Sequence, residues 1–237
     1  MDVARMPVAA IILDMDGLMV DTEPLYKTAW QAACTELGFD LNDERYAKIV
    51  GRPLPDCERV LAEEFGPSFS LDKLRARWPA IWREEVGRLG IQTKPGLDAL
   101  LALAEEHRLD VAVATSTNAD WARSTLERAG LTNRFDIIVT GDQIARGKPA
   151  PDIYLEAARR LGVAPGACVA IEDSEAGIQS IAAAGMLGIL VPHWTPSAAA
   201  RAAAHTVVPS LHEACEVIAG LLARDANLIV STPGDHK

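Results

Sequence analysis

The chain has 237 residues, of which 49% are hydrophobic, and its formal net charge is −10. This length suits one large domain or a core domain with an insert, and the apolar content excludes a largely disordered chain. The negative charge argues against nucleic acid or an anionic membrane surface as the main partner. It does not exclude an anionic small molecule, because a bound cation reverses the local electric field.

The cysteine pattern and the N-terminal sequence bear on the compartment. Cys34, Cys57, Cys168 and Cys215 lie far apart, so no zinc or redox motif is present. Reduced thiols in a cytosolic protein are the simplest interpretation, and Cys168 is expected to be buried in an apolar run. The first apolar run is stopped by Asp14 and is too short for a signal peptide or a membrane span. We therefore expect a cytoplasmic protein, a monomer or a homodimer, with no membrane partner.

The first quarter of the chain changes from one strand to a long helical block. An apolar run predicts a buried strand from Val8 to Asp14, directly before an acidic turn. Four helices are then predicted from apolar residues at helical spacing and from capping residues. They run from Pro24 to Leu37, from the Asn42–Asp43 cap to Ile49, from Asp56 to Phe65, and from Ser70 to Leu89. A helical block of this size is not a normal crossover between strands, so we predict an inserted helical subdomain.

From Lys94-Pro95-Gly96 onward, helices and strands alternate regularly. Repeated strand–helix units predict an α/β fold with a doubly wound, mostly parallel sheet. The predicted strands are 111–115, 137–140, 168–171, 187–191 and 206–208, and the predicted helices are 97–107, 120–129, 151–161, 175–184, 198–203 and 211–222. The expected division is a core domain of residues 1–19 and 93–224, a helical domain of residues 20–92, and a frayed tail of residues 225–237.

Polar residues follow four of the predicted strands. In a parallel sheet these strand ends share one edge, where open α/β sheets bind ligands. Each group also has a simpler interpretation. Asp14-Met15-Asp16 could be an acidic surface turn and Thr115 to Asn118 a helix cap. Lys148 could be a solvated lysine, and Glu172-Asp173-Ser174 a helix N-cap cluster. Their joint occurrence favours a site. The groups are Asp14-Met15-Asp16, Thr115-Ser116-Thr117-Asn118, the loop with Lys148, and Glu172-Asp173-Ser174.

Four carboxylates would converge at this edge: Asp14, Asp16, Glu172 and Asp173. Like charges packed together raise one another's pKa or require a cation, and Mg²⁺ prefers oxygen ligands. We therefore predict Mg²⁺ between Asp14 and Asp173, with coordination left open for a phosphate oxygen. Other phosphate oxygens would be bound by Lys148, by strand-end hydroxyls and by backbone N–H groups at a helix start.

The order of these motifs resembles the haloacid dehalogenase-like hydrolase superfamily. The motifs are Asp-x-Asp-Gly, a strand-end Thr, Gly-Lys-Pro-Ala-Pro-Asp and Glu-Asp-Ser-x-Ala-Gly. The resemblance is closest to β-phosphoglucomutase-like and phosphoglycolate-phosphatase-like members, and it extends from about Ala9 to Leu222. It implies a Rossmann-like core with an all-helical cap inserted after the first motif. It also implies a Mg²⁺-dependent phosphatase that hydrolyses a small phosphomonoester through an aspartyl-phosphate.

The resemblance further implies a role for each matching residue. Asp14 would be the nucleophile, and Asp16 the general acid and then the base. The cation would be held by Asp14, Asp173 and the backbone carbonyl of Asp16, with Glu172 orienting a metal-bound water. The transferring phosphoryl group would be stabilised by Thr115 and Lys148, beside the substrate-binding residues Ser116, Thr117 and Asn118.

Three other functions are alternatives to a phosphatase: a dehalogenase, a phosphosugar mutase and a non-catalytic binding protein. Dehalogenases of this superfamily lack an acid at the position of Asp16, which makes dehalogenation the weaker alternative. Phosphosugar mutases typically carry His and Lys where this chain has Tyr26 and Val50. A non-catalytic binding protein on the same fold is the third alternative, and the complete set of motif residues argues against it.

Specificity is expected to depend on the helical domain. Glu23, Tyr26 and Arg52 are the candidate substrate-binding residues there. An acid at position 23 disfavours a second anion and suits a hydroxyl-bearing substrate, such as a sugar or polyol phosphate. Trp78 and Trp82 either line the site or, as we favour, pack in the helical core. The hinges between the domains are predicted at residues 18–22 and 92–95.

Overall fold

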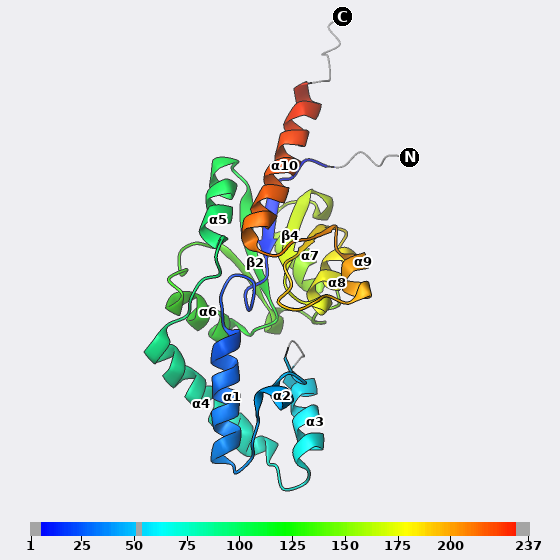
Figure 1. Ribbon diagram of the computed structural model, residues 1–237. Helices are drawn as coiled ribbons and strands as arrows, with labels where there is room; N and C mark the ends of the chain where they lie inside the picture. The colour runs from blue at the N-terminus through cyan, green and yellow to red at the C-terminus, as the bar shows by residue number, and fades with distance from the viewer. Residues whose placement is uncertain (1–5, 51–53, 231–237) are drawn as a thin grey trace, which may run out of the picture. The chain divides into compact units, whose positions relative to one another are not determined.

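The computed structural model describes residues 6–50 and 54–230 (Figure 1). The chain divides into two compact units. One contains the residues up to Val20 together with those from Thr93 onward, and the other contains Asp21–Gln92. The second unit is therefore an insertion into the first.

The first unit is built on a parallel six-stranded sheet within the described part of the chain. The order of its strands is β3-β2-β1-β4-β5-β6, and every pairing is parallel. The doubly wound α/β fold expected from the alternating pattern is thus confirmed. The strands are β1 Ala10–Leu13, β2 Asp110–Thr115, β3 Ile137–Thr140, β4 Cys168–Glu172, β5 Leu187–Leu190 and β6 Thr206–Val207.

Helices cover both faces of this sheet, which explains why its central strands β1 and β4 are apolar apart from Glu172 at the end of β4. Every residue of β1 and β4 is buried. On one face, α7, α8 and α9 share a core with the central strands, and Figure 1 shows α5 and α10 on the other face. The helices of this unit are α5 Leu97–Glu106, α6 Ala119–Arg128, α7 Asp152–Leu161, α8 Glu175–Ala183, α9 Ala198–Ala203 and α10 Leu211–Val230, with short 3₁₀ turns at Gly141–Gln143 and Pro165–Ala167.

The strand order places a topological switch point between β1 and β4. From β1 the chain continues outward to β2 and β3, and it then returns to add β4, β5 and β6 on the other side. In register, Leu13 of β1 pairs with Val113 of β2 and with Ile171 of β4. Ligands of open α/β sheets bind outside the carboxyl ends of the strands at such a point. The residues that follow β1 and β4 are therefore the first place to look for a site.

The two segments that connect the units pair with each other. Val20 forms an antiparallel bridge with Thr93. The N–H of Lys94 donates to the carbonyl of Met19 at 2.8 Å, and the N–H of Asp21 donates to the carbonyl of Gln92 at 2.8 Å. The predicted hinge segments thus lie side by side as a short ribbon.

The inserted unit is helical, as expected. Its helices are α1 Glu23–Glu36, α2 Asp43–Tyr46, α3 Leu54–Phe65 and α4 Leu71–Leu89. Asn42 and Ser70 cap α2 and α4 with their side chains. The aromatic residues of α1 and α4 pack together: Trp78 lies 6.0 Å from Tyr26 and 5.9 Å from Trp30, ring centre to ring centre. Trp82 is 1% exposed, so the favoured interpretation as a core residue is confirmed for Trp82. Trp78 is half-buried, and its packing against Tyr26 and Trp30 agrees with the same interpretation.

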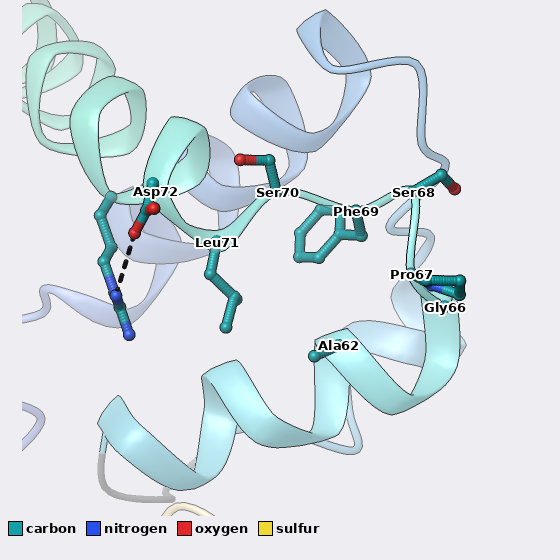
Figure 2. A pocket seen from close by; sticks show the side chains of 9 residues that line it. Ala62, Gly66, Pro67, Ser68, Phe69, Ser70, Leu71 and Asp72 are labelled. Atoms are coloured by element: carbon teal, nitrogen blue, oxygen red, sulfur yellow. Dashed lines mark hydrogen bonds and ion pairs between the residues drawn. The ribbon is translucent and has the colours of Figure 1, made fainter.

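An open hollow of about 650 Å³ lies in this unit where α3 ends and α4 begins (Figure 2). Its wall includes Phe69 and Leu71, together with the cap residue Ser70 of α4. Arg75 also lines the hollow, and it forms ion pairs with Glu58 at 2.7 Å and with Asp72 at 3.3 Å. The hollow is thus a structural consequence of the α3–α4 turn.

Several predicted boundaries were wrong, and three of them concern helices. Helix α2 ends at Tyr46 rather than at Ile49, and α3 begins at Leu54, so Asp56 lies in its first turn rather than at its cap. Helix α10 continues to Val230, although we expected a frayed tail from Asp225. The Asp225 carboxylate accepts a hydrogen bond of 2.9 Å from the backbone N–H of Val8, which ties this part of the helix to the segment before β1.

None of the helices within residues 6–50 and 54–230 has the length and apolar character needed to cross a membrane.

The hydrogen bond from Val8 to Asp225 predicts that Asp225, which was expected to belong to the tail, stabilises the fold. Asp225→Ala should lower the free energy of unfolding by about 1–2 kcal/mol, because a part-buried N–H loses its acceptor. Asp225→Asn retains an acceptor and should recover most of that loss. Urea unfolding of both variants, with the exposed Glu106→Ala as a control, measures the effect. Equal stability of Asp225→Ala and the wild type would show that the helix end contributes nothing.

Candidate active site

The ends of β1 and β4 are joined by a buried lysine. Lys148 comes from the loop before α7, and its side chain is 6% exposed. Its Nζ lies 2.5 Å from Oδ1 of Asp14, 2.6 Å from Oε1 of Glu172 and 3.1 Å from the carbonyl of Ala114. The alternative interpretation of Lys148 as a solvated loop residue was therefore wrong.

Glu172 accepts hydrogen bonds from five donors. Its Oε1 is bound by Lys148 and, at 3.1 Å, by the hydroxyl of Tyr154. Its Oε2 accepts from the N–H of Asp173 at 2.9 Å, and from the N–H and hydroxyl of Ser174 at 2.8 and 2.9 Å. An ionised carboxylate has about four lone-pair sites. These contacts favour a role for Glu172 in holding Lys148 and the β4–α8 turn, rather than the predicted role at the metal.

The position of Glu172 depends on the absence of a side chain at Gly177. A Cβ at this position would lie 1.7 Å from Oε1 of Glu172. Gly177 belongs to the first turn of α8, and its N–H donates to the hydroxyl of the cap residue Ser174 at 3.1 Å. The sequence Glu172-Asp173-Ser174-x-x-Gly177 thus both caps the helix and makes room for the carboxylate.

The carboxylates at this edge fit a hard cation. One oxygen from each of Asp14, Glu172 and Asp173 lies within 4.8 Å of the others. With Asp16, four acids face one ammonium group, that of Lys148, so the site carries excess negative charge. An oxygen-rich, acidic cluster of this kind suits Mg²⁺. Asp14 and Asp173 are the better candidates to hold it, because the oxygens of Glu172 are already engaged.

Burial sets different protonation tendencies within this cluster. Burial raises the pKa of Asp14 to about 8, and the charges of Glu172 and Asp16 add to the rise against the opposing effect of Lys148. Burial, Glu172 and Asp14 raise the pKa of Asp173 well above its usual value. Burial also acts to raise the pKa of Glu172, but the charge and hydrogen bond of Lys148 outweigh it and lower that pKa. A divalent cation beside Asp14 and Asp173 would restore both to the ionised form.

Two threonines at the end of β2 hold the side chain of Asp16. The Thr117 hydroxyl donates to Oδ2 of Asp16 at 2.8 Å. Thr115 is 1% exposed; its hydroxyl lies 3.5 Å from the same oxygen and accepts from the N–H of Thr117 at 3.1 Å. The predicted neighbourhood of Asp16 and Thr115 is therefore present, and Thr117 makes the shorter contact.

The other two residues of this segment have different surroundings. Asn118 caps α6 by accepting the N–H of Trp121 at 3.0 Å, which is the simpler role considered for this segment. Ser116 is exposed, and its carbonyl lies where a Cβ on Gly141 would be, at 2.2 Å. A substrate-binding role for Ser116 and Asn118 stays a prediction.

The candidate specificity residues lie in the helical unit. Glu23 accepts a hydrogen bond of 2.9 Å from the hydroxyl of Tyr46. Tyr26 packs against Trp78 and Trp82. Arg52 lies outside the described residues. Roles for these three in substrate binding stay predictions.

Tyr154 and His193, which were not identified from the sequence, also lie around the candidate site. Tyr154 lies on the buried face of α7, fully inaccessible, and bonds Glu172. His193 follows β5, and its Nε2 lies 2.7 Å from the carbonyl of Gly17. His193 could have been predicted to lie near the site, because β5 also runs parallel to β4 and its carboxyl end lies at the same edge of the sheet. A tyrosine in an amphipathic helix, by contrast, is indistinguishable from an ordinary core residue.

Comparisons with known proteins agree with this geometry. A family model of haloacid dehalogenase-like hydrolases matches residues 8–185. The chain is 34% identical to a phosphorylated carbohydrates phosphatase of Thermotoga maritima, over 75% of this chain and 82% of that protein. It is 32% identical to hexitol phosphatase B of Escherichia coli, over 78% and 84%. A crystal structure of a candidate β-phosphoglucomutase from Thermotoga maritima superposes with a TM-score of 0.78 at 31% identity, covering 90% of this chain and 99% of that one.

The close packing of Gly177 against Glu172 yields a stability prediction. Gly177→Ala should lower the free energy of unfolding by about 1–3 kcal/mol, because the added methyl group displaces a carboxylate held by five donors. Gly220→Ala is the matched control: it lies within α10 with open space around its Cβ position, and it should raise stability by about 0.5–1 kcal/mol. Chemical denaturation of both variants measures the difference. A Gly177→Ala protein as stable as Gly220→Ala would refute the packing argument.

Proposed function

The chain belongs to the haloacid dehalogenase-like hydrolase family, and on that basis we propose that it is a Mg²⁺-dependent phosphatase of a small phosphomonoester, such as a sugar or polyol phosphate. The observation that carries the proposal is the cluster of Asp14, Lys148 and Asp173 at the switch point of the sheet. It offers a nucleophile, a cation for phosphate oxygens and a ligand set for a metal ion. We assign the reaction to this edge of the sheet.

Asp14 is the proposed nucleophile. One of its carboxylate oxygens attacks phosphorus in line, the P–O bond to the alcohol breaks, and an aspartyl-phosphate forms. Attack requires the ionised carboxylate, and Lys148 at 2.5 Å favours that form against the effect of burial. When bound, Mg²⁺ would be held by Asp14, Asp173 and the main-chain carbonyl of Asp16, and would supply charge stabilisation for phosphate oxygens.

Asp16 is the proposed acid and base. It gives its proton to the leaving alkoxide, and in the second half-reaction it takes a proton from the water that hydrolyses the aspartyl-phosphate. The hydroxyl of Thr117 donates to Asp16 and supports its orientation between these steps. Thr115 and Lys148 are proposed to stabilise the charge on the phosphoryl group.

The substrate class rests on the relatives. Two of them are named as phosphatases of phosphorylated carbohydrates and of hexitols. The acid at Glu23 supports a hydroxyl-bearing substrate without a second anion near it. A screen of sugar and polyol monophosphates for released phosphate, with phosphorylated carboxylic acids as the contrasting class, ranks the candidates.

A phosphosugar mutase is the second candidate, because the structural neighbour is a candidate β-phosphoglucomutase. The residues at Tyr26 and Val50 differ from the His and Lys typical of mutases. Incubation with β-glucose 1-phosphate and a bisphosphate primer separates the two. Glucose 6-phosphate forming faster than free phosphate would reverse the order of these functions. Activity on a haloacid, or none on any phosphate ester, would favour the dehalogenase or the non-catalytic alternative.

The surroundings in which the enzyme acts are also proposed. None of the four cysteines, all of which lie in the described part of the chain, forms a disulfide, which supports a reducing compartment such as the cytoplasm. The proposed partner is the phosphorylated metabolite itself, with neither nucleic acid nor membrane required. Whether the protein is a monomer or a homodimer is a prediction for sedimentation to decide.

The nucleophile assignment predicts the behaviour of Asp14→Asn. Turnover of p-nitrophenyl phosphate with Mg²⁺ should fall at least about 10³-fold, because the amide cannot form the intermediate. The fold should persist, since the substitution removes one of several crowded acids. Asp110→Asn, an exposed aspartate at the opposite end of β2, should keep full activity. Circular dichroism and thermal unfolding verify that both variants fold.

The outcomes separate the parts of the proposal. Near-normal turnover by Asp14→Asn would remove Asp14 from the mechanism. Turnover by the wild type that survives exhaustive chelation would remove the magnesium requirement but not the nucleophile.

A further inference from the structure

A histidine beyond the fifth strand contacts the turn that follows the first. His193 lies three residues after the end of β5 at Leu190, and its side chain is 28% exposed. Its Nε2 is 2.7 Å from the carbonyl oxygen of Gly17. A carbonyl oxygen only accepts hydrogen bonds, so Nε2 carries a proton and donates. The side chain thus reaches past the end of β4 to bind the β1 turn.

The same imidazole lies beside Asp173. Its Nε2 is 3.8 Å from Oδ2 of that carboxylate. Gly17 has φ +81°, and a Cβ there would come within 2.3 Å of Oδ2 of Asp173 and 3.4 Å of Nε2 of His193. The turn, the carboxylate and the imidazole therefore converge with no space for a side chain at position 17.

The turn itself is tight and carries Asp16. The N–H of Gly17 donates to the carbonyl of Val20 at 3.0 Å, and the N–H of Met19 donates to the carbonyl of Met15 at 2.9 Å. Fixing the Gly17 carbonyl from outside limits rotation of the neighbouring peptide groups, including the one whose carbonyl belongs to Asp16. A single side chain thus acts on two elements of the candidate metal site.

We propose that His193 is a positioning residue of the metal site, which fixes the Gly17 turn through its Nε2–H and confines the carboxylate of Asp173 from one side. This inference rests on the proposed Mg²⁺ dependence. Groups that orient metal ligands typically change metal affinity by about 10–100-fold when they are removed. The effect should appear in metal binding before it appears in turnover at saturating metal.

Metal binding in the absence of substrate is the direct test. Mn²⁺, which electron paramagnetic resonance detects as the free ion, serves as the probe for wild type, His193→Ala, His193→Gln and the control His212→Ala, an exposed histidine of α10. His193→Ala should weaken Mn²⁺ binding about 10-fold. His193→Gln, which retains an N–H donor of similar reach, should recover most of the affinity. His212→Ala should bind as the wild type does.

Two further measurements separate positioning from loss of structure. Thermal unfolding without metal should be similar for His193→Ala and His212→Ala, because the imidazole is part-exposed and its removal opens no core cavity. A long-range ¹H–¹⁵N spectrum should show His193 protonated at Nε2 in the wild type.

Each contrary result has a distinct meaning. Wild-type Mn²⁺ affinity in His193→Ala would overturn the inference and leave the phosphatase proposal intact. A wild-type protein that binds no Mn²⁺ would overturn the metal site and this inference with it. Failure of His193→Gln to recover any affinity would show that the donated hydrogen bond is not the cause.

Discussion

A buried ammonium group shared by two carboxylates is the interaction on which the candidate site depends. Lys148 lies between Asp14 and Glu172, and all three are almost inaccessible to solvent. A buried charge without a partner is strongly destabilising, and the two carboxylates together stabilise the ammonium group of Lys148. The loop that contains Lys148 is itself fixed by a hydrogen bond, which the hydroxyl of Ser180 donates to the carbonyl of Ala150 at 2.6 Å.

Two neighbouring acids at the end of β4 have different contacts, although one oxygen of each lies within 4.8 Å of the other. Glu172 faces Tyr154 and Gly177, is bound by five donors and has a lowered pKa. Asp173 faces Gly17 and His193, and its pKa is raised. These contacts agree with the proposal that Glu172 holds the lysine and that Asp173 is a ligand of the cation.

The sequence was sufficient for the sheet and for the residues at strand ends. Asp14, Thr115, Lys148 and Asp173 were identifiable because apolar runs fix the strands and parallel pairing brings their ends together. Contacts between segments distant in the chain were not identifiable. Two of the donors to Glu172, Lys148 and Tyr154, come from elsewhere in the chain. Likewise, α10 continues past residue 224, where Asp225 accepts a hydrogen bond from Val8 near the other end of the chain. The spacing of apolar residues predicts which face of a helix or strand is buried, but not which residues pack against that face.

The two acids at the end of β4, Glu172 and Asp173, each occupy the space where a glycine lacks a side chain. Oxygens of Glu172 fill the Cβ position of Gly177, and Oδ2 of Asp173 fills that of Gly17. Gly177 is five residues beyond Glu172, whereas Gly17 belongs to the turn that follows β1. Substitution is thus constrained in pairs: a side chain gained at either glycine has to be matched by a shorter or displaced acid. An acid kept at full length is therefore expected to favour glycine at the position that its carboxylate fills.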